Sequence, residues 1–167
     1  MSAADEIYLW LIAPIEERMM RAVTRLVRDP DEAADAFQNA LAQVWRDLEK
    51  IRRHPNPRAY ILRVCVSAAY DALRRRARRG RREGPLENAG EAAPAPGDPA
   101  RSALERERRE EVLAALAALP PQQAQALVLR AIEDQPFDVV AQALGCSEAT
   151  ARSHVRKARG RLRKLLE

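Results

Sequence analysis

The residues of this sequence best suited to chemistry are arginines that recur near its C-terminal end. Arg152, Arg156, Arg159 and Arg163 are separated by steps of four, three and four residues, so on a helix they would share one side. Arginine can donate two parallel hydrogen bonds to a guanine edge, and the serine and lysine beside these arginines can bind phosphate. The spacing therefore predicts a helix that binds nucleic acid.

The segment that precedes these arginines has the pattern of a helix-turn-helix. Apolar residues predict a short helix over 137–144, Gly145 can end it because glycine tolerates a positive φ, and Ser147 can cap the next helix. The second helix should bury an apolar stripe that consists of Ala151, Val155, Ala158, Leu162 and Leu165. Such a helix fits the major groove of DNA. The alternatives are a solvated basic helix and a helix-turn-helix that contacts protein.

Two helices in the N-terminal half also carry polar residues that could meet a partner. The first begins at Asp29-Pro30, which suit a helix cap and a first helical position, and it places Asp35, Gln38 and Asn39 beside an apolar face. The second begins at Asn56-Pro57 and ends in an arginine run, where seven of the residues 74–82 are Arg. The first helix could simply be an ordinary amphipathic helix. The arginine run of the second could be a solvated basic tail or, as the functional alternative, a surface that binds phosphate.

Helical periodicity dominates the whole chain, and no strand pattern is visible. It predicts helices over residues 3–27, 30–48, 57–82, 102–118, 122–133, 137–144 and 148–165. Residues 83–101 are rich in Pro, Gly, Ala and Glu and too poor in large apolar residues to pack a core, which predicts a flexible linker. We therefore predict an all-α fold of two small helical domains, residues 1–82 and 102–167, with the helix-turn-helix in the second.

Composition narrows the classes of function. The net charge of +5 favours an anionic partner, and the low aromatic content of 4% suits modest helical cores. The cysteines Cys65 and Cys146 stand far apart and the histidines are His54 and His154, so we expect neither a disulfide nor a metal site. No apolar run approaches the roughly 18 residues that span a bilayer, and no basic segment precedes the N-terminal apolar patch. We expect a cytoplasmic protein with no membrane insertion and no cofactor.

Three segments together resemble the extracytoplasmic-function sigma factors of bacterial RNA polymerase. DEAADAFQNALAQVWRDL resembles the polymerase-binding helix of that family, and NPRAYILRVCVSAAYDALRRRARR resembles its promoter-melting helix, which reads the minus-10 element. LAALPPQQAQALVLRAIEDQPFDVVAQALGCSEATARSHVRKARGRLRKLL resembles its minus-35-reading domain and is the most specific match. The resemblance covers nearly the whole chain except the linker. It implies a sigma factor without enzymatic activity, which directs promoter-specific initiation.

The resemblance also implies a role for particular residues. Core polymerase, through the clamp helices of its β′ subunit and its β flap, would meet a set consisting of Asp35, Gln38, Asn39, Leu41 and Trp45. The minus-10 element would meet Asn56, Arg58, Tyr60, Arg63, Ser67, Asp71, Arg74 and Arg75, with residues 51–60 as a loop that captures a base. The minus-35 element would meet Ser147, Thr150, Arg152, Ser153, Arg156, Lys157 and Arg159. An anti-sigma protein is a further possible partner in this family.

The sequence departs from the family pattern in several places. Asn39 stands where an acidic residue is common, Tyr60 where tryptophan is common and Ser67 where asparagine is common. Residues 134–136, Asp-Gln-Pro, replace a Gly-Leu-Ser type of turn. These changes bear on polymerase affinity and on base preference.

Other classes of protein compete with this interpretation. A free-standing helix-turn-helix regulator of the two-component type would have a similar C-terminal half, but it should also carry a βα receiver domain, and no strand is visible. A nuclease would need a cluster of carboxylates or histidines suited to a metal ion, which the sequence lacks.

Overall fold

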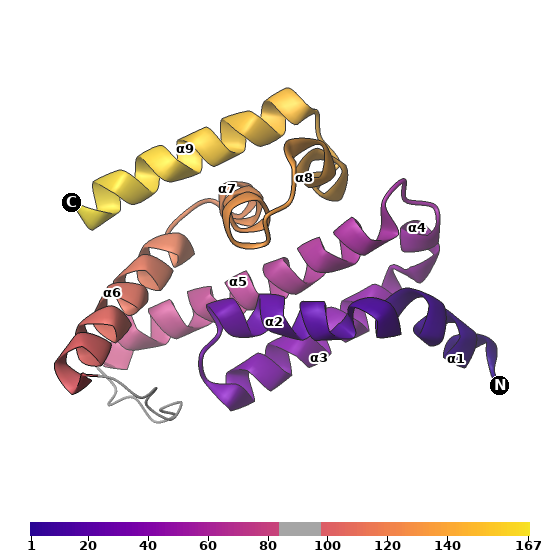
Figure 1. The fold of residues 1–167 in the computed structure, drawn as a ribbon, viewed down its shortest axis with the longest axis horizontal. Helices are drawn as coiled ribbons and strands as arrows, with labels where there is room; N and C mark the ends of the chain where they lie inside the picture. Colours follow the sequence, from indigo (N-terminus) through magenta and orange to yellow (C-terminus); the bar gives the residue numbers. More distant parts are fainter. Residues whose placement is uncertain (84–97) are drawn as a thin grey trace.

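The structure is a computed structural model, and it describes residues 1–83 and 98–167. Within these ranges the chain forms helices and short connections, and no strand occurs among them (Figure 1). This confirms the predicted all-α class. Residues 84–97, which include most of the predicted linker, lie outside the described residues.

The predicted first helix, residues 3–27, is interrupted. It consists of α1 (Ala3–Ile7), a π-helical turn (Tyr8–Ile12), a 3-10 turn (Ala13–Ile15) and α2 (Glu16–Leu26). Pro14 lies at this change of helix type, and proline disturbs an α-helix because it has no backbone N–H and its ring clashes with the preceding turn. The next helix, α3 (Pro30–Arg46), is followed by a short helix α4 (Leu48–Arg52) that the sequence pattern did not predict. The long helix α5 spans Pro57–Glu83.

The C-terminal half begins with α6 (Pro99–Ala117), so residues 99–101 and Glu83, at the ends of the predicted linker, are helical. Asp98 caps α6 by accepting a hydrogen bond from the Ala100 N–H at 3.1 Å. The chain continues through α7 (Pro121–Leu127), a π-helical turn (Val128–Ile132), α8 (Phe137–Leu144) and α9 (Glu148–Leu166). The last two helices match the predicted helix-turn-helix to within one residue.

The predicted helix caps are confirmed. Oδ1 of Asp29 accepts a hydrogen bond from the N–H of Glu32 at 2.9 Å, and Oδ1 of Asn56 accepts one from the N–H of Ala59 at 3.1 Å. Each cap satisfies a backbone donor that a helix start otherwise leaves unpaired. The starts of α3 and α5 are therefore set locally, by single residues.

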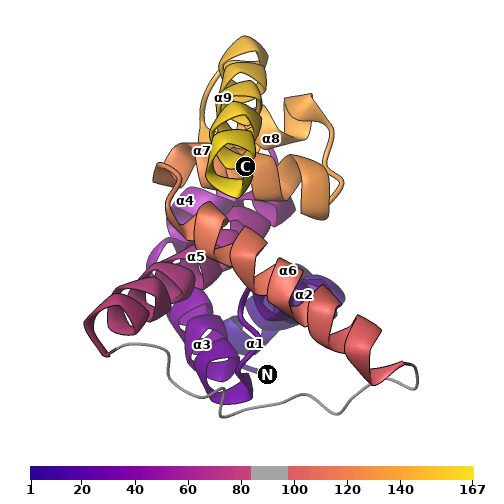
Figure 2. The same ribbon diagram turned by 90° about the vertical axis from the view of Figure 1, so that its left-hand side faces the viewer.

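The helices lie in layers, which both views of the ribbon show (Figures 1 and 2). The helix α9 is outermost on one side, α7 and α8 lie between α9 and α5, and α2 and α3 cover the opposite side of α5. The buried apolar residues form one connected cluster that includes members of both halves. The two predicted helical units are thus packed against each other along α5.

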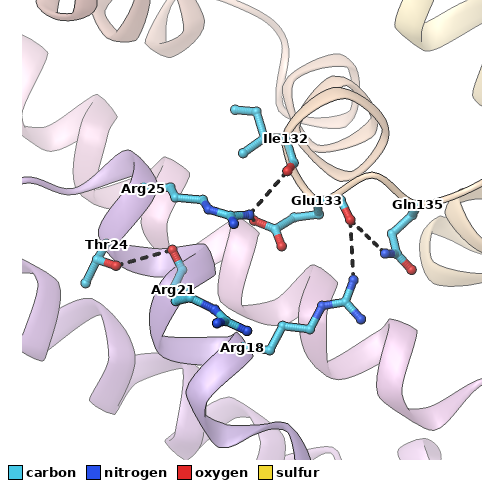
Figure 3. Close-up of polar contacts among 7 residues, drawn as sticks. All are labelled: Arg18, Arg21, Thr24, Arg25, Ile132, Glu133 and Gln135. Carbon is cyan, nitrogen blue, oxygen red and sulfur yellow. Dashed lines mark hydrogen bonds and ion pairs between the residues drawn. The ribbon is translucent and has the colours of Figure 1, made fainter.

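Polar contacts join the two halves where α2 faces the end of the π-helical turn Val128–Ile132. Arg25 donates to the Ile132 carbonyl oxygen at 3.2 Å and forms an ion pair with Oε1 of Glu133 at 3.0 Å. Arg18, two turns earlier on α2, donates to the Glu133 carbonyl oxygen at 3.3 Å. Figure 3 shows both arginines reaching from α2 toward Glu133. Because Glu133 follows a helix end, its carbonyl is available to these donors.

Candidate nucleic-acid interface

The turn into α9 is built from two local features that the sequence predicted. Gly145 has φ +67° and ψ +37°, the left-handed conformation that glycine adopts without steric cost. Oγ of Ser147 accepts a hydrogen bond from the N–H of Thr150 at 3.1 Å and so caps α9. The side chains of Ala151, Val155 and Ala158 are buried against the helices beneath, which leaves the arginine side of α9 facing outward.

The predicted minus-35 residues therefore lie on an open surface. All of them are exposed except Ser153, which is half-buried; the exposed members are Ser147, Thr150, Arg152, Arg156, Lys157 and Arg159. The predicted apolar stripe is shorter than expected. Leu162 is half-buried and Leu165 is 53% exposed, because the last turns of α9 extend past the helices that cover its start.

Arg152 is held in place more firmly than an isolated surface arginine. Its Nη2 atom lies 2.7 Å from Oε1 of Glu148 on the preceding turn, and its guanidinium lies 4.2 Å from the centroid of the Phe137 ring. Arg130 lies 5.1 Å from the centroid of the same ring. Cation–π contacts of this kind favour a fixed position of the guanidinium. Phe137 was not among the predicted site residues, since an aromatic residue at a helix start is more often a packing residue.

The predicted minus-10 residues lie along α5 and the turn before it, and several face the C-terminal half. Nδ2 of Asn56 donates to Oε1 of Gln142 at 3.2 Å, and Oγ of Ser67 accepts a hydrogen bond from Nε2 of Gln125 at 3.3 Å. The Tyr70 hydroxyl, between Ser67 and Asp71, donates to the Leu119 carbonyl oxygen. Others are open, and the exposed members are Arg58, Asp71 and Arg75. The predicted minus-10 residues thus follow α5 and the turn before it, but they are divided between covered and open positions.

Tyr60 differs most from a base-stacking surface residue, because only 4% of it is exposed. Its hydroxyl donates to Oδ2 of Asp47 at 3.1 Å, its ring packs edge-on against His54, and Arg63 lies 4.9 Å from the ring centroid. Hydrogen bonds from Gln43 and then from Tyr60 lower the pKa of Asp47, so this carboxylate is a stable acceptor. The predicted loop 51–60 is shorter than expected, because residues 51–52 end α4 and residues 57–60 begin α5, which leaves 53–56 as the connection. Tyr60, on the first turn of α5, is tied to Asp47, which lies between α3 and α4.

The predicted polymerase-binding residues form one open face of α3. Asp35, Gln38 and Asn39 are exposed, Trp45 is 39% exposed and Leu41 is half-buried. The helix α3 lies on the side of α5 away from α9 (Figures 1 and 2). An exposed tryptophan beside polar residues is typical of protein-binding surfaces. No described helix is long and apolar enough to cross a membrane, and the described residues contain no His, Cys, Asp or Glu group that could hold a metal ion.

Sequence reasoning missed the residues that join the two halves. Gln142 pairs with Asn56 across 86 positions of the chain, and Glu133 pairs with Arg25 across 108. Hydrophobic periodicity reports which side of a helix is buried, but it carries no information on which distant polar residue completes a contact. The one local signal of these contacts is at residues 134–136, where the sequence departs from the Gly-Leu-Ser type of turn. There Asp134 adopts φ +54°, which glycine would adopt more easily.

An all-helical protein with an open basic recognition helix and a second basic helix belongs to the class of helix-turn-helix DNA-binding proteins. Two family descriptions match this chain, "Sigma-70 region 2" over residues 11–79 and "Sigma-70, region 4" over residues 109–162. The chain is 32% identical to the RNA polymerase sigma-E factor of Streptomyces coelicolor, over 90% of its own length and 81% of the relative. It is 30% identical to the sigma-E factor of Streptomyces avermitilis, over 91% and 80%.

Solved structures show the same fold. The chain is similar to the sigma factor RpoE from Bartonella quintana, solved in complex with the anti-sigma factor NepR, with a TM-score of 0.54 and 21% identity over 99% of this chain and 98% of the other. It is also similar to the extracytoplasmic function sigma factor SigJ of Mycobacterium tuberculosis, with a TM-score of 0.51 and 24% identity over 89% and 50%.

This chain belongs to the RNA polymerase sigma factors of the extracytoplasmic-function type. As a member of that family it binds core RNA polymerase and promoter DNA and acts in transcription initiation. The presence of both sigma regions in one chain disfavours the alternative of a free-standing helix-turn-helix regulator.

Proposed function

We propose that the three surfaces described above divide the work of a sigma factor. Residues 1–82 bind core polymerase and capture the minus-10 element, and residues 102–167 read the minus-35 element. The observation that carries this proposal is the open basic side of α9, capped by Ser147 and turned outward by its buried alanine and valine side. A helix in this setting enters the major groove with its first turns.

The minus-35 element is read by the first turns of α9. Arg152 and Arg156 face the base edges, and Ser153 and Lys157 contact the flanking phosphates. Arg163, about three turns after Arg152, contributes charge without reading a base.

The minus-10 element is opened by the segment 51–60, which comprises the end of α4, the connection 53–56 and the start of α5. Capture of an unstacked non-template base offsets the few kcal/mol that unstacking costs, while Arg74 and Arg75 hold phosphates of the same strand. This role consists of binding alone, so the chain catalyses no covalent step. It acts in the cytoplasm, where polymerase and DNA meet. An anti-sigma protein regulates it, a proposal supported by the similar Bartonella quintana protein, which was solved in complex with the anti-sigma factor NepR.

Core polymerase is bound by the face of α3. The clamp helices of the β′ subunit contact Gln38, Asn39 and Trp45, and the β flap contacts the C-terminal half. A minority of interface residues, clustered near the centre, cost more than about 1 kcal/mol each when truncated. Weakened binding to core enzyme is therefore the expected result of Gln38→Ala combined with Asn39→Ala.

The test is co-purification of the full chain with core polymerase, followed by transcription from promoters selected out of a random library. The matched control is Glu107→Ala combined with Arg108→Ala, an exposed polar pair on α6. Retention of the double α3 variant at the level of this control would contradict the assignment of the α3 face. Failure of the wild-type holoenzyme to start transcription at any library promoter would contradict the proposed function itself.

A further inference from the structure

A cavity enters the structure beside the segment 51–60. Its volume is about 190 Å³, and it is lined by residues of α2, of the start of α5 and of the segment that leads into α8. Met19 and Ala59 in its wall are buried, whereas Arg58 is exposed. The cavity therefore runs from the surface to the edge of the apolar core, and its lining decides which kind of molecule it can hold.

Positive charge lines the cavity. Arg18 and Arg58 belong to its wall, and no carboxylate is among its lining residues in the described part of the chain. Arg18 donates to the carbonyl oxygen of Glu133 at 3.3 Å, and Arg58 forms no ion pair with any described residue (Figure 3). The first turn of α8, which includes Val139, has no side-chain cap, so its N–H groups favour a negative charge nearby. The cavity is therefore suited to an anion.

The rest of the lining is neutral, and most of it is apolar. Met19, Leu62 and Val139 contribute apolar side chains, and Asn56 and Gln135 contribute amides. A guanidinium binds a carboxylate best, through two parallel hydrogen bonds, and an apolar wall favours a ligand that removes it from water. A cavity of about 150 Å³ holds a molecule the size of benzene, so the present one fits an apolar body of about one ring.

We propose that this cavity is a binding site for a small carboxylate with an apolar body of about one ring, the class of molecule to which benzoate belongs. The guanidiniums of Arg18 and Arg58 hold the carboxylate, and the ring packs against Met19, Leu62 and Val139. The ligand replaces water in the cavity without requiring a new arrangement of the helices. Binding itself does not depend on what the chain does to DNA.

The site also has a regulatory consequence, which rests on the proposed function. Asn56 and Arg58 both line the cavity and both belong to the residues assigned to the minus-10 element. A carboxylate bound to Arg58 neutralises a charge that would otherwise meet a DNA phosphate, and such contacts supply much of the affinity for DNA. The ligand should therefore lower transcription initiation by occupying part of the segment that opens the minus-10 element.

Isothermal titration calorimetry of the full chain with benzoate tests the site. We expect saturable binding with a dissociation constant below about 1 mM. Acetate has the charge without the ring and benzyl alcohol has the ring without the charge, so each should bind at least about tenfold more weakly. Equal binding of acetate would overturn the apolar part of the site, and equal binding of benzyl alcohol would overturn the role of the arginines. Absence of saturable benzoate binding would overturn the proposal.

Two substitutions separate the charge of the site from its space. Arg58→Gln, at an exposed position, should weaken benzoate binding at least about tenfold. Its control, Arg21→Gln, removes the same charge from an arginine that pairs with Glu17 of its own helix at 3.2 Å. Val139→Phe fills the cavity and should abolish binding, whereas Val112→Phe adds the same ring at a 40% exposed position of α6. Wild-type binding by either cavity variant, with helicity unchanged by circular dichroism, would overturn the location of the site.

Transcription in vitro tests the regulation. With benzoate at its dissociation constant, the wild-type holoenzyme should start about half as many transcripts, because about half of the chains are occupied. Val139→Phe should transcribe equally with and without benzoate, which also controls for an effect on core polymerase. Inhibition of Val139→Phe, or no inhibition of the wild type, would overturn the regulation. Calorimetry involves neither polymerase nor DNA, so failure of transcription without benzoate would count against the proposed function and leave the binding site intact.

Discussion

The two helices that carry the basic residues, α9 and α5, are presented in opposite ways. The arginine side of α9 is open and Arg152 is fixed by Glu148 and Phe137, whereas α5 is covered at Asn56 and Ser67 by the other half of the chain. A helix that reads intact duplex gains from being open at all times, because its target is always present. A surface that captures a single strand has a target only after the duplex has begun to open. The difference therefore matches the order in which the two elements are used.

The largest effect should come from the segment that connects the two halves of the chain. Removing residues 84–97, which lie outside the described residues, should lower transcription from promoters with both elements by at least about tenfold, because a tether that cannot span two sites contributes nothing to joint binding. Scrambling the same residues should leave transcription largely intact. At about 3.3 Å per residue, 14 residues reach at most about 46 Å, which is more than one turn of DNA at about 3.4 Å per base pair. Transcription in vitro measures both variants, and equal loss from both would show specific contacts in the segment.

The second prediction concerns α9. It tests whether the start of this helix reads bases while its C-terminal end supplies only charge. Arg152→Ala should cost roughly 1–3 kcal/mol at one base pair and change the ranking of single-base minus-35 variants. Arg163→Ala, the control, should weaken all variants together and reduce the salt slope by about one, as loss of a phosphate contact does. Binding of holoenzyme to the variant panel at several salt concentrations measures both. An unchanged ranking after Arg152→Ala would show that α9 does not enter the groove as proposed.

Local features of this structure could be predicted from the sequence, and distant pairings could not. The caps at Asp29, Asn56 and Ser147 and the left-handed turn at Gly145 follow from the chemistry of single residues. The break at Pro14 was predictable in kind, although the predicted helix ran through it.

The covering of α5 had no signal in the sequence. Gln125 and Gln142 are ordinary polar residues until the fold brings them to Ser67 and Asn56. Glu133 is likewise an unremarkable acidic residue at a helix end, and only the packing of the C-terminal half onto α2 buries its carboxylate. Residue types and spacing therefore predicted the candidate site surfaces, while their open or covered state came from the tertiary structure.

The third prediction concerns how stability depends on pH, and it compares Cys65 on α5 with Cys146 before α9. Burial, and secondly the charge of Glu133, raise the pKa of Cys65 to about 12, while burial raises the pKa of the half-exposed Cys146 without a charged neighbour. The folded chain keeps the Cys65 thiol neutral, so its contribution to stability is complete below pH 9 and is lost as the pH rises from 9 toward 12. The loss is about 1.4 kcal/mol at pH 10.

Denaturant unfolding between pH 8 and pH 10.5 measures this loss as a fall in the free energy of unfolding. Cys65→Ala should remove the largest single share of the fall and Cys146→Ala a smaller one, while Tyr70, whose pKa burial also raises, accounts for part of the rest. Equal slopes in the two variants would mean that the α5 side of the interface is as accessible to water as the turn before α9.

The smallest effect concerns the support beneath Arg152. Phe137→Leu keeps an apolar side chain at the start of α8 but removes the ring face that lies 4.2 Å from the Arg152 guanidinium. A cation–π contact at an exposed site is worth about 0.5–1 kcal/mol, so discrimination at the base pair read by Arg152 should fall by about two- to fivefold. The ion pair with Glu148 remains and limits the loss. In the Arg152→Ala background the same substitution should leave the ranking of minus-35 variants unchanged, because the guanidinium that Phe137 supports is absent. A further change of ranking in that background would assign Phe137 to the packing of α8 rather than to the position of Arg152.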